Sequence, residues 1–113
     1  MKIEVRFRGL VSSPAMYELV VRRIHVHLSR FGRQLSGVFI RIGDINGPKG
    51  GVDKRCQVTV RGPRVGTTSL EDLSGDTASA IDMALERVAR AVGRSVERTR
   101  SLRYARAALR PAP

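Results

Sequence analysis

A run of regular hydrophobic spacing between positions 80 and 100 constrains the fold of this chain more than any other feature. Five aliphatic residues recur there at helical intervals: Ile81, Leu85, Val88, Val92 and Val96. Four arginines recur at similar intervals: Arg87, Arg90, Arg94 and Arg98. At about 100° per residue, the two sets lie on nearly opposite sides of one helix. We therefore predict a long helix that turns one face to a core and exposes a stripe of arginines on the other.

The residues before this helix predict four strands and one further helix. Alternation of apolar and polar residues predicts the strands, of which the last has the weakest pattern: 2–8, 36–45, 54–61 and 65–72. Helical spacing predicts a helix over 14–31, with Ser13 as its N-cap and Pro14 at its first position. The crossover helix makes the first two strands parallel, and the short connections make the other pairs antiparallel. The fold class is thus α+β, in the order β-α-β-β-β-α, with a four-stranded mixed sheet and both helices on one face.

Two segments fall outside these elements. The run Asn46–Gly51 is rich in glycine and predicts a flexible loop between strands. The last ten residues, 104–113, are basic and end in Pro-Ala-Pro, which predicts a flexible tail after a single domain at 1–103.

The charge of the chain points to a polyanionic partner. Lys and Arg number 21 against 10 Asp and Glu, which gives a net charge of +11, and 18 of the 21 cations are arginine. Guanidinium groups match phosphate geometry, so nucleic acid is the first candidate partner. A membrane is disfavoured because no apolar run approaches ~18 residues and tryptophan is absent.

No constellation of residues predicts catalysis or a bound cofactor. Cys56 alternates with apolar neighbours in a strand, so we expect a buried thiol rather than a nucleophile. His25 and His27 lie two residues apart on a helix, so they project in different directions and cannot share a metal. The Gly47–Lys54 segment lacks the Gly-Lys-Ser/Thr ending of a nucleotide loop. We predict no enzyme, cofactor, metal or small-molecule substrate, and, without a secretory signal at Met1–Gly9, a cytoplasmic protein.

The arginine stripe is the predicted RNA-binding site. Its four members lack an intervening acid on their own face, and mutual repulsion of uncompensated cations costs stability that a phosphate backbone would offset. Arg100 extends the positive field, and one edge of the first helix adds Arg23, His27 and Arg30. A competing basic surface is the solvent face of the sheet: Lys2, Arg6, Arg8, Arg41, Arg55 and Arg61. Phe39 is the one aromatic residue expected to face outward from a strand, which favours recognition of shape and backbone over stacking of many bases.

The chain resembles the family of ribosome hibernation promoting factors and ribosome-associated inhibitors, in its short form. The resemblance spans about residues 1 to 100 and rests on the order of elements, on the segment Val52-Asp53-Lys54-Arg55-Cys56-Gln57-Val58, and on Ala80-Ile81-Asp82 followed by a basic helix. It implies a non-catalytic factor that binds the small ribosomal subunit and its rRNA, occupies the channel of messenger and transfer RNA, and inhibits translation under stress or in stationary phase.

The resemblance also implies which residues contact RNA. The basic positions of the family's last helix correspond to Arg87, Arg90, Arg94 and Arg98. Long members continue into a second domain that pairs ribosomes, whereas this sequence shows none before Pro113. We therefore do not expect it to pair ribosomes by itself, and a second factor would be involved if ribosome dimers form. Two other functions remain open from the residues: a general module for structured RNA, and a regulator whose basic surface docks an acidic protein.

Overall fold

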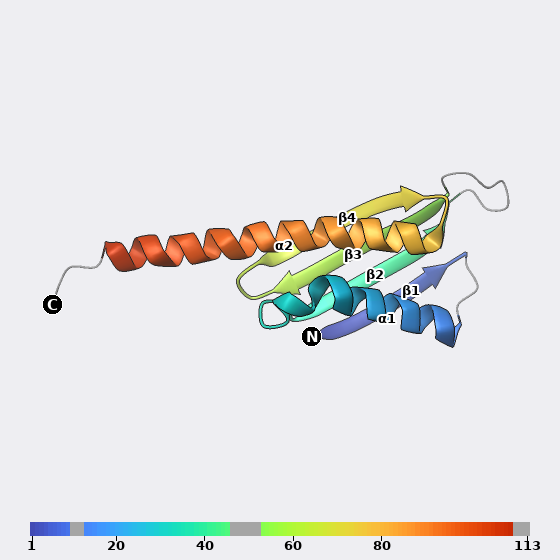
Figure 1. The fold of residues 1–113 in the computed structure, drawn as a ribbon, viewed down its shortest axis with the longest axis horizontal. Coiled ribbons are helices and arrows are strands. Elements are labelled where there is room, and N and C mark those ends of the chain that lie inside the picture. The colour runs from blue at the N-terminus through green and yellow to red at the C-terminus, as the bar shows by residue number, and fades with distance from the viewer. Residues whose placement is uncertain (10–12, 46–52, 110–113) are drawn as a thin grey trace.

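A computed structural model describes residues 1–9, 13–45 and 53–109, in the predicted order of strands and helices (Figure 1). The elements follow one another along the chain as β1 (Lys2–Arg8), α1 (Pro14–Leu28), the 3-10 turn η1 (Ser29–Phe31), β2 (Gly37–Asp44), β3 (Lys54–Gly62), β4 (Gly66–Ser74) and α2 (Thr77–Ala108). The predicted loop Asn46–Gly51 and the last four residues of the predicted tail lie outside the described residues.

The four strands form one mixed sheet in the order β1-β2-β3-β4. β1 and β2 are parallel, with Val5 opposite Ile40, whereas β2 with β3 and β3 with β4 are antiparallel. Alternate residues of each strand therefore point to opposite faces of the sheet. The predicted α+β class, strand directions and element order are confirmed.

Both helices lie on the same face of the sheet, as predicted. α2 lies over β3 and β4, and α1 lies beside α2 and over β1 (Figure 1). The largest fully buried side chains come from both helices and the inner strands: Ile24, Leu28, Ile42, Ile81 and Leu85. This single core leaves the opposite face of the sheet without a covering layer among the described residues.

The first helix ends earlier than its hydrophobic spacing predicts. α1 begins at Pro14, where the Ser13 hydroxyl accepts a hydrogen bond from the backbone N–H of Met16 at 3.1 Å, as expected of an N-cap. It ends at Leu28, and the chain tightens into η1, which includes Phe31. The tighter turn redirects Phe31 toward α2, where its Cζ lies 3.7 Å from the position that a Cβ on Gly93 would occupy.

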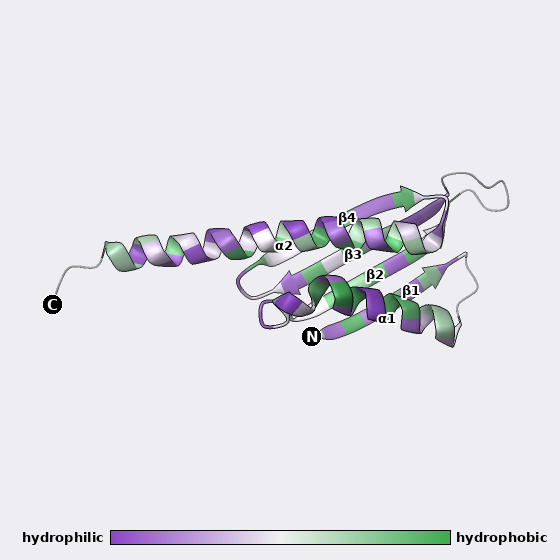
Figure 2. Cartoon of the chain, in the orientation of Figure 1, coloured by the Kyte–Doolittle hydropathy of each residue, from purple (hydrophilic) through white to green (hydrophobic). Residues whose placement is uncertain are grey.

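The second helix is longer than predicted and projects beyond the sheet. α2 continues to Ala108, so residues 104–108 of the predicted tail are helical. The molecule is elongated, with extents of 68 × 25 × 17 Å, because the last turns of α2 pass the end of the β3–β4 hairpin (Figure 1). Hydrophilic residues continue along this projecting part (Figure 2). None of the described helices is both long enough and apolar enough to span a membrane.

Candidate nucleic-acid interface

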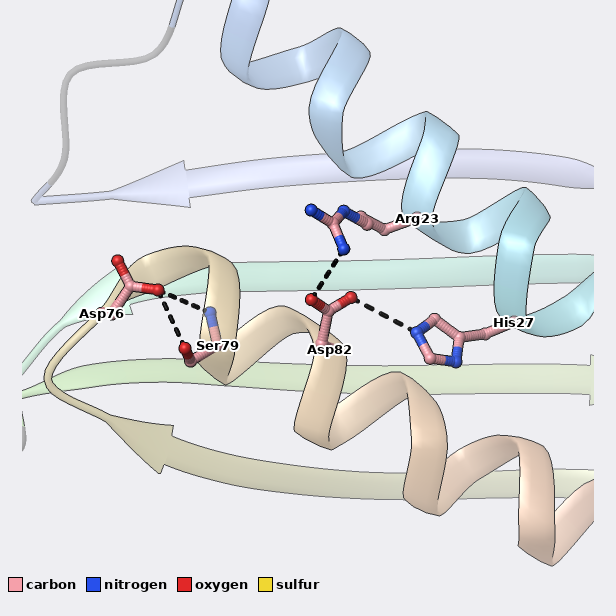
Figure 3. Close-up of polar contacts among 5 residues, drawn as sticks. All are labelled: Arg23, His27, Asp76, Ser79 and Asp82. Carbon is pink, nitrogen blue, oxygen red and sulfur yellow. Dashed lines mark hydrogen bonds and ion pairs between the residues drawn. The ribbon is translucent and has the colours of Figure 1, made fainter.

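The start of α2 is fixed by a hydrogen-bonded cap. The Asp76 carboxylate accepts hydrogen bonds from the backbone N–H and the hydroxyl of Ser79, both at 2.9 Å (Figure 3). These hydrogen bonds lower the pKa of Asp76 below its ordinary value, since they favour the charged carboxylate. The cap sets where the helix begins, and therefore the rotation at which all later side chains emerge from it.

Asp82 joins the two helices. Its carboxylate accepts a hydrogen bond from Arg23 at 2.9 Å and lies 3.3 Å from Nε2 of His27 (Figure 3). The preceding Ala80 and Ile81 are completely buried. The Ala80-Ile81-Asp82 segment thus supplies two core residues and one contact to α1. Arg23 and His27, both predicted to bind RNA, lie at this bridge, where Asp82 partly neutralises the charge of Arg23 and contacts the His27 ring.

The structure brings Arg30 together with three arginines of the predicted stripe. An open groove runs between η1 and the middle of α2, and we call it the arginine groove. It is lined by Arg30, Phe31, Arg90, Gly93, Arg94, Val96, Glu97 and Arg98. The guanidinium carbon of Arg30 lies 4.7 Å from the centre of the Phe31 ring, which holds this arginine at the rim.

Phe31 and Gly93 form the floor of the groove, and sequence reasoning did not assign either to the site. Gly93 has no side chain, so the Phe31 ring can lie close to α2. A signal was present in the sequence, because an isolated glycine inside a strongly helical pattern costs stability and usually has a packing reason. The groove therefore combines a partly apolar floor with a cationic rim.

Arg87 points away from the arginine groove. Its guanidinium donates a hydrogen bond to the backbone carbonyl of Glu71 at 2.7 Å and lies 3.6 Å from the Asp72 carboxylate. Glu71 and Asp72 belong to β4, on the other side of α2 from η1. The predicted stripe is thus divided: Arg87 contacts the sheet, and the arginines at 90, 94 and 98 face the groove.

The expectation that all four arginines lack acidic partners is wrong. Arg90 pairs with Glu86 one turn earlier, and Arg87 lies near Asp72. Among the described residues, Arg94 has no ion-pair or hydrogen-bond partner, and Arg98 contacts only the Ser95 hydroxyl, at 3.2 Å. Exposed ion pairs contribute little to stability, so a phosphate can replace Glu86 at Arg90 at small cost.

Arg100 belongs to a different part of the surface. It lies 4.0 Å from Glu97 and lines a second hollow, between the projecting end of α2 and the β3–β4 connection, together with Arg64, Arg103 and Tyr104. The Thr99 hydroxyl donates a hydrogen bond to the Ser95 carbonyl within the helix at 3.0 Å and lies 3.5 Å from the Arg64 carbonyl oxygen. Arg100 therefore extends the positive field along α2 without entering the arginine groove.

The thiol of Cys56 and the charged groups near it are buried or paired within the protein. The Cys56 thiol is completely buried, and burial, with a smaller effect of the Asp72 charge, raises its pKa to about 12. This thiol stays protonated and unreactive at neutral pH. Lys54 donates hydrogen bonds to Asp44 at 3.0 Å and to the buried Asp53 at 3.2 Å, which raise the pKa of the lysine. No group of three or more His, Cys, Asp or Glu side chains in the described part of the chain could hold a metal ion.

Comparison with solved structures identifies the fold. A ribosomal subunit interface protein from Coxiella burnetii matches with a TM-score of 0.68 at 19% identity, over 83% of this chain and 96% of that one. The N-terminal domain of Protein Y from Thermus thermophilus matches with a TM-score of 0.67 at 22% identity, over 83% of this chain and 98% of that domain. The chain shares their fold. No protein-family model and no curated protein sequence matches it. The fold implied by the sequence resemblance is therefore confirmed.

Proposed function

We propose that this protein is a non-catalytic factor that binds the small ribosomal subunit through the arginine groove and inhibits translation. The observation that carries the proposal is the convergence of Arg30 with Arg90, Arg94 and Arg98 around one open groove. Four arginines and a single acidic residue, Glu97, line this groove, which gives a surface suited to the phosphates of a folded RNA. The shared fold with a protein named for the ribosomal subunit interface supports the ribosome as the source of that RNA.

The mechanism we propose is steric. The domain would occupy the channel that messenger and transfer RNA otherwise use, under stress or in stationary phase, in the cytoplasm. Arg23 would add to the positive field from the Asp82 bridge, where His27 can donate a hydrogen bond to RNA. Arg87 and Arg100 would add to the field from either side of the groove. No bond is made or broken, so inhibition requires only that the protein and the RNA ligands compete for the same space.

Cosedimentation with purified small subunits over a salt series tests this function. We expect the logarithm of the affinity to fall linearly with the logarithm of salt concentration, with a slope of roughly −3 to −4 if each groove arginine neutralises one phosphate. Saturating protein should also displace transfer RNA and messenger RNA from the subunit. Undiminished binding of both would refute the proposed mechanism. Equal affinity for a free RNA duplex at matched salt would indicate a general RNA-binding module, and absence from ribosomal particles would indicate a protein partner.

Two substitutions of Gly93 should change the stability of the fold and the affinity for RNA independently of each other. A Cβ there would meet the Phe31 ring at an ordinary contact distance, so Gly93→Ala should stabilise the helix by about 0.5–1 kcal/mol and leave binding intact. Gly93→Glu places a carboxylate on the floor of the groove and should weaken binding to small subunits by at least about tenfold. Thermal melting and filter binding measure the two effects. Equal affinities of the two variants would mean that RNA does not enter the groove.

A further inference from the structure

The uncovered face of the sheet carries an aromatic ring surrounded by arginines. The register places Phe39 of β2 between Glu4 of β1 and Thr59 of β3. The next row of the same face contains Arg6, Arg41 and Gln57, and the row on the other side contains Arg61. These side chains surround a shallow hollow of about 460 Å³ on the side of the sheet opposite the helices.

The ring of Phe39 lies flat enough against the sheet to cover Gly37. A Cβ on Gly37 would lie 3.1 Å from Cε2 and 3.2 Å from Cζ of Phe39, so the glycine makes room for the ring. The guanidinium carbon of Arg61 is 5.4 Å from the ring centre. Phe39 remains half-buried, with part of its ring open to solvent on a face that the core does not use.

The charges around the ring favour an anion. Arg6 is paired with Glu4, at 2.9 Å. Arg41, by contrast, has no ion-pair or hydrogen-bond partner within the described parts of the chain, and Arg61 contacts no carboxylate there. Two guanidinium groups without acidic partners therefore lie next to one half-buried aromatic ring: Arg61 over its face, and Arg41 in the neighbouring row of the sheet.

We propose that this hollow binds an unpaired nucleotide of single-stranded RNA: the exposed Arg61 side chain moves off the Phe39 ring, the base stacks there in its place, and Arg41 and Arg61 contact the phosphates. An aromatic ring on an open sheet face, next to cations, provides both stacking for a base and charge for the backbone. Gln57, which lines the hollow opposite Arg41, can donate to and accept from a base edge. The site lies on the opposite side of the molecule from the arginine groove and does not depend on the function proposed for that groove.

A nucleotide fits this surface better than an acidic peptide does. The hydrogen bond from Arg6 lowers the pKa of Glu4, so this residue stays ionised at the edge of the hollow. The exocyclic amine of cytosine can donate a hydrogen bond to this carboxylate, whereas the ionised side chain of an acidic peptide has no donor to offer it. The flat ring adds nothing for a carboxylate side chain, but it matches the face of a base.

Fluorescence anisotropy with a short labelled oligocytidylate and the full chain tests the proposal. Phe39→Leu keeps an apolar side chain but removes the aromatic face, and it should weaken binding on the order of tenfold without changing the salt slope. Arg41→Gln should weaken binding severalfold and reduce the slope by roughly 0.7. Arg22→Gln is the matched control, since Arg22 is an exposed residue of α1 with no partner among the described residues.

Three outcomes would overturn the site. The first is Phe39→Leu binding within about twofold of the wild type, with circular dichroism showing an intact fold. The second is equal affinity for an abasic oligonucleotide of the same length, which would exclude stacking. The third is competition by polyglutamate as strong as that by RNA of equal charge, which would indicate a protein ligand. The probe contains no ribosome, so these results stand whether or not the arginine groove binds the small subunit.

Discussion

Replacing Arg94 and Arg98 together by glutamate is expected to weaken binding to small ribosomal subunits by at least about a hundredfold. These two groove arginines have no acidic partner among the described residues, so their charge is available to phosphate. The change removes two phosphate contacts and places two carboxylates against the RNA backbone, so both attraction and specificity of docking are lost. Both side chains are exposed, and the two new glutamates, one helical turn apart, cost only about 0.2–0.5 kcal/mol through their repulsion, so the fold should be retained.

The matched control is Arg22→Glu with Arg33→Glu. These exposed residues also have no ion-pair partner within the described residues, and the double change alters the net charge equally. Filter binding at fixed salt should show only a severalfold loss for the control. If the control variant lost as much affinity as the groove variant, binding would depend on net charge alone. If the groove variant bound as tightly as the wild type, the RNA site would lie on another surface.

Arg90 is left unchanged in this test because it both lines the groove and forms an ion pair within the helix. Its guanidinium pairs with Glu86, so Arg90→Glu would set two carboxylates one helical turn apart and destabilise the exposed helix. Arg87 is unsuitable for a related reason, since it donates a hydrogen bond to the Glu71 carbonyl and joins α2 to β4. Loss of binding in either variant could therefore come from a shifted helix instead of a lost phosphate contact.

Local periodicity was sufficient to predict the fold. Apolar residues alternate along β1, β2 and β3 because every second side chain faces the core, and they recur at helical spacing in α2 for the same reason. In the register of the sheet, the apolar residues of neighbouring strands lie opposite one another. The end of α2 was missed because burial stops near Val96. The following residues are rich in arginine and alanine, which have high helix propensity, so the helix continues to Ala108 without a core to pack on.

The groove itself depends on packing that no local pattern encodes. Helical geometry alone places Arg87 with Arg90, Arg94 and Arg98, but it does not say which neighbour lies on each side of α2. The structure places β4 on one side, where Arg87 finds Glu71 and Asp72, and η1 on the other, where Arg30 joins the remaining arginines. Arg30 and Arg94 are distant in sequence, and their proximity follows from the position of Phe31 against Gly93.

Substitution of Gly62 by alanine is expected to destabilise the fold by about 3 kcal/mol or more. A Cβ at Gly62, the last residue of β3, would lie 1.8 Å from the backbone carbonyl oxygen of Gln34. Backbone cannot move aside as a flexible side chain can. The segment that carries Gln34 is also held in place, because the Ser36 N–H donates a hydrogen bond to the Arg61 carbonyl at 2.7 Å.

Gly62→Ala should also disturb the shape of the arginine groove, because the segment that carries Gln34 is hydrogen-bonded to Phe31. The backbone N–H groups of Gln34 and Leu35 both donate to the Phe31 carbonyl, so displacement of Gln34 disturbs the residue that forms the floor. Gly32→Ala is the matched control, because Gly32 has helical φ −54 and ψ −32 and a Cβ there would lie 3.3 Å from the Ser29 carbonyl oxygen, a tight contact but far from the 1.8 Å overlap at Gly62. Urea unfolding should show a large loss of stability for Gly62→Ala and a much smaller loss for Gly32→Ala. Wild-type stability of Gly62→Ala would mean that β3 and the Gln34 segment are not in contact in solution.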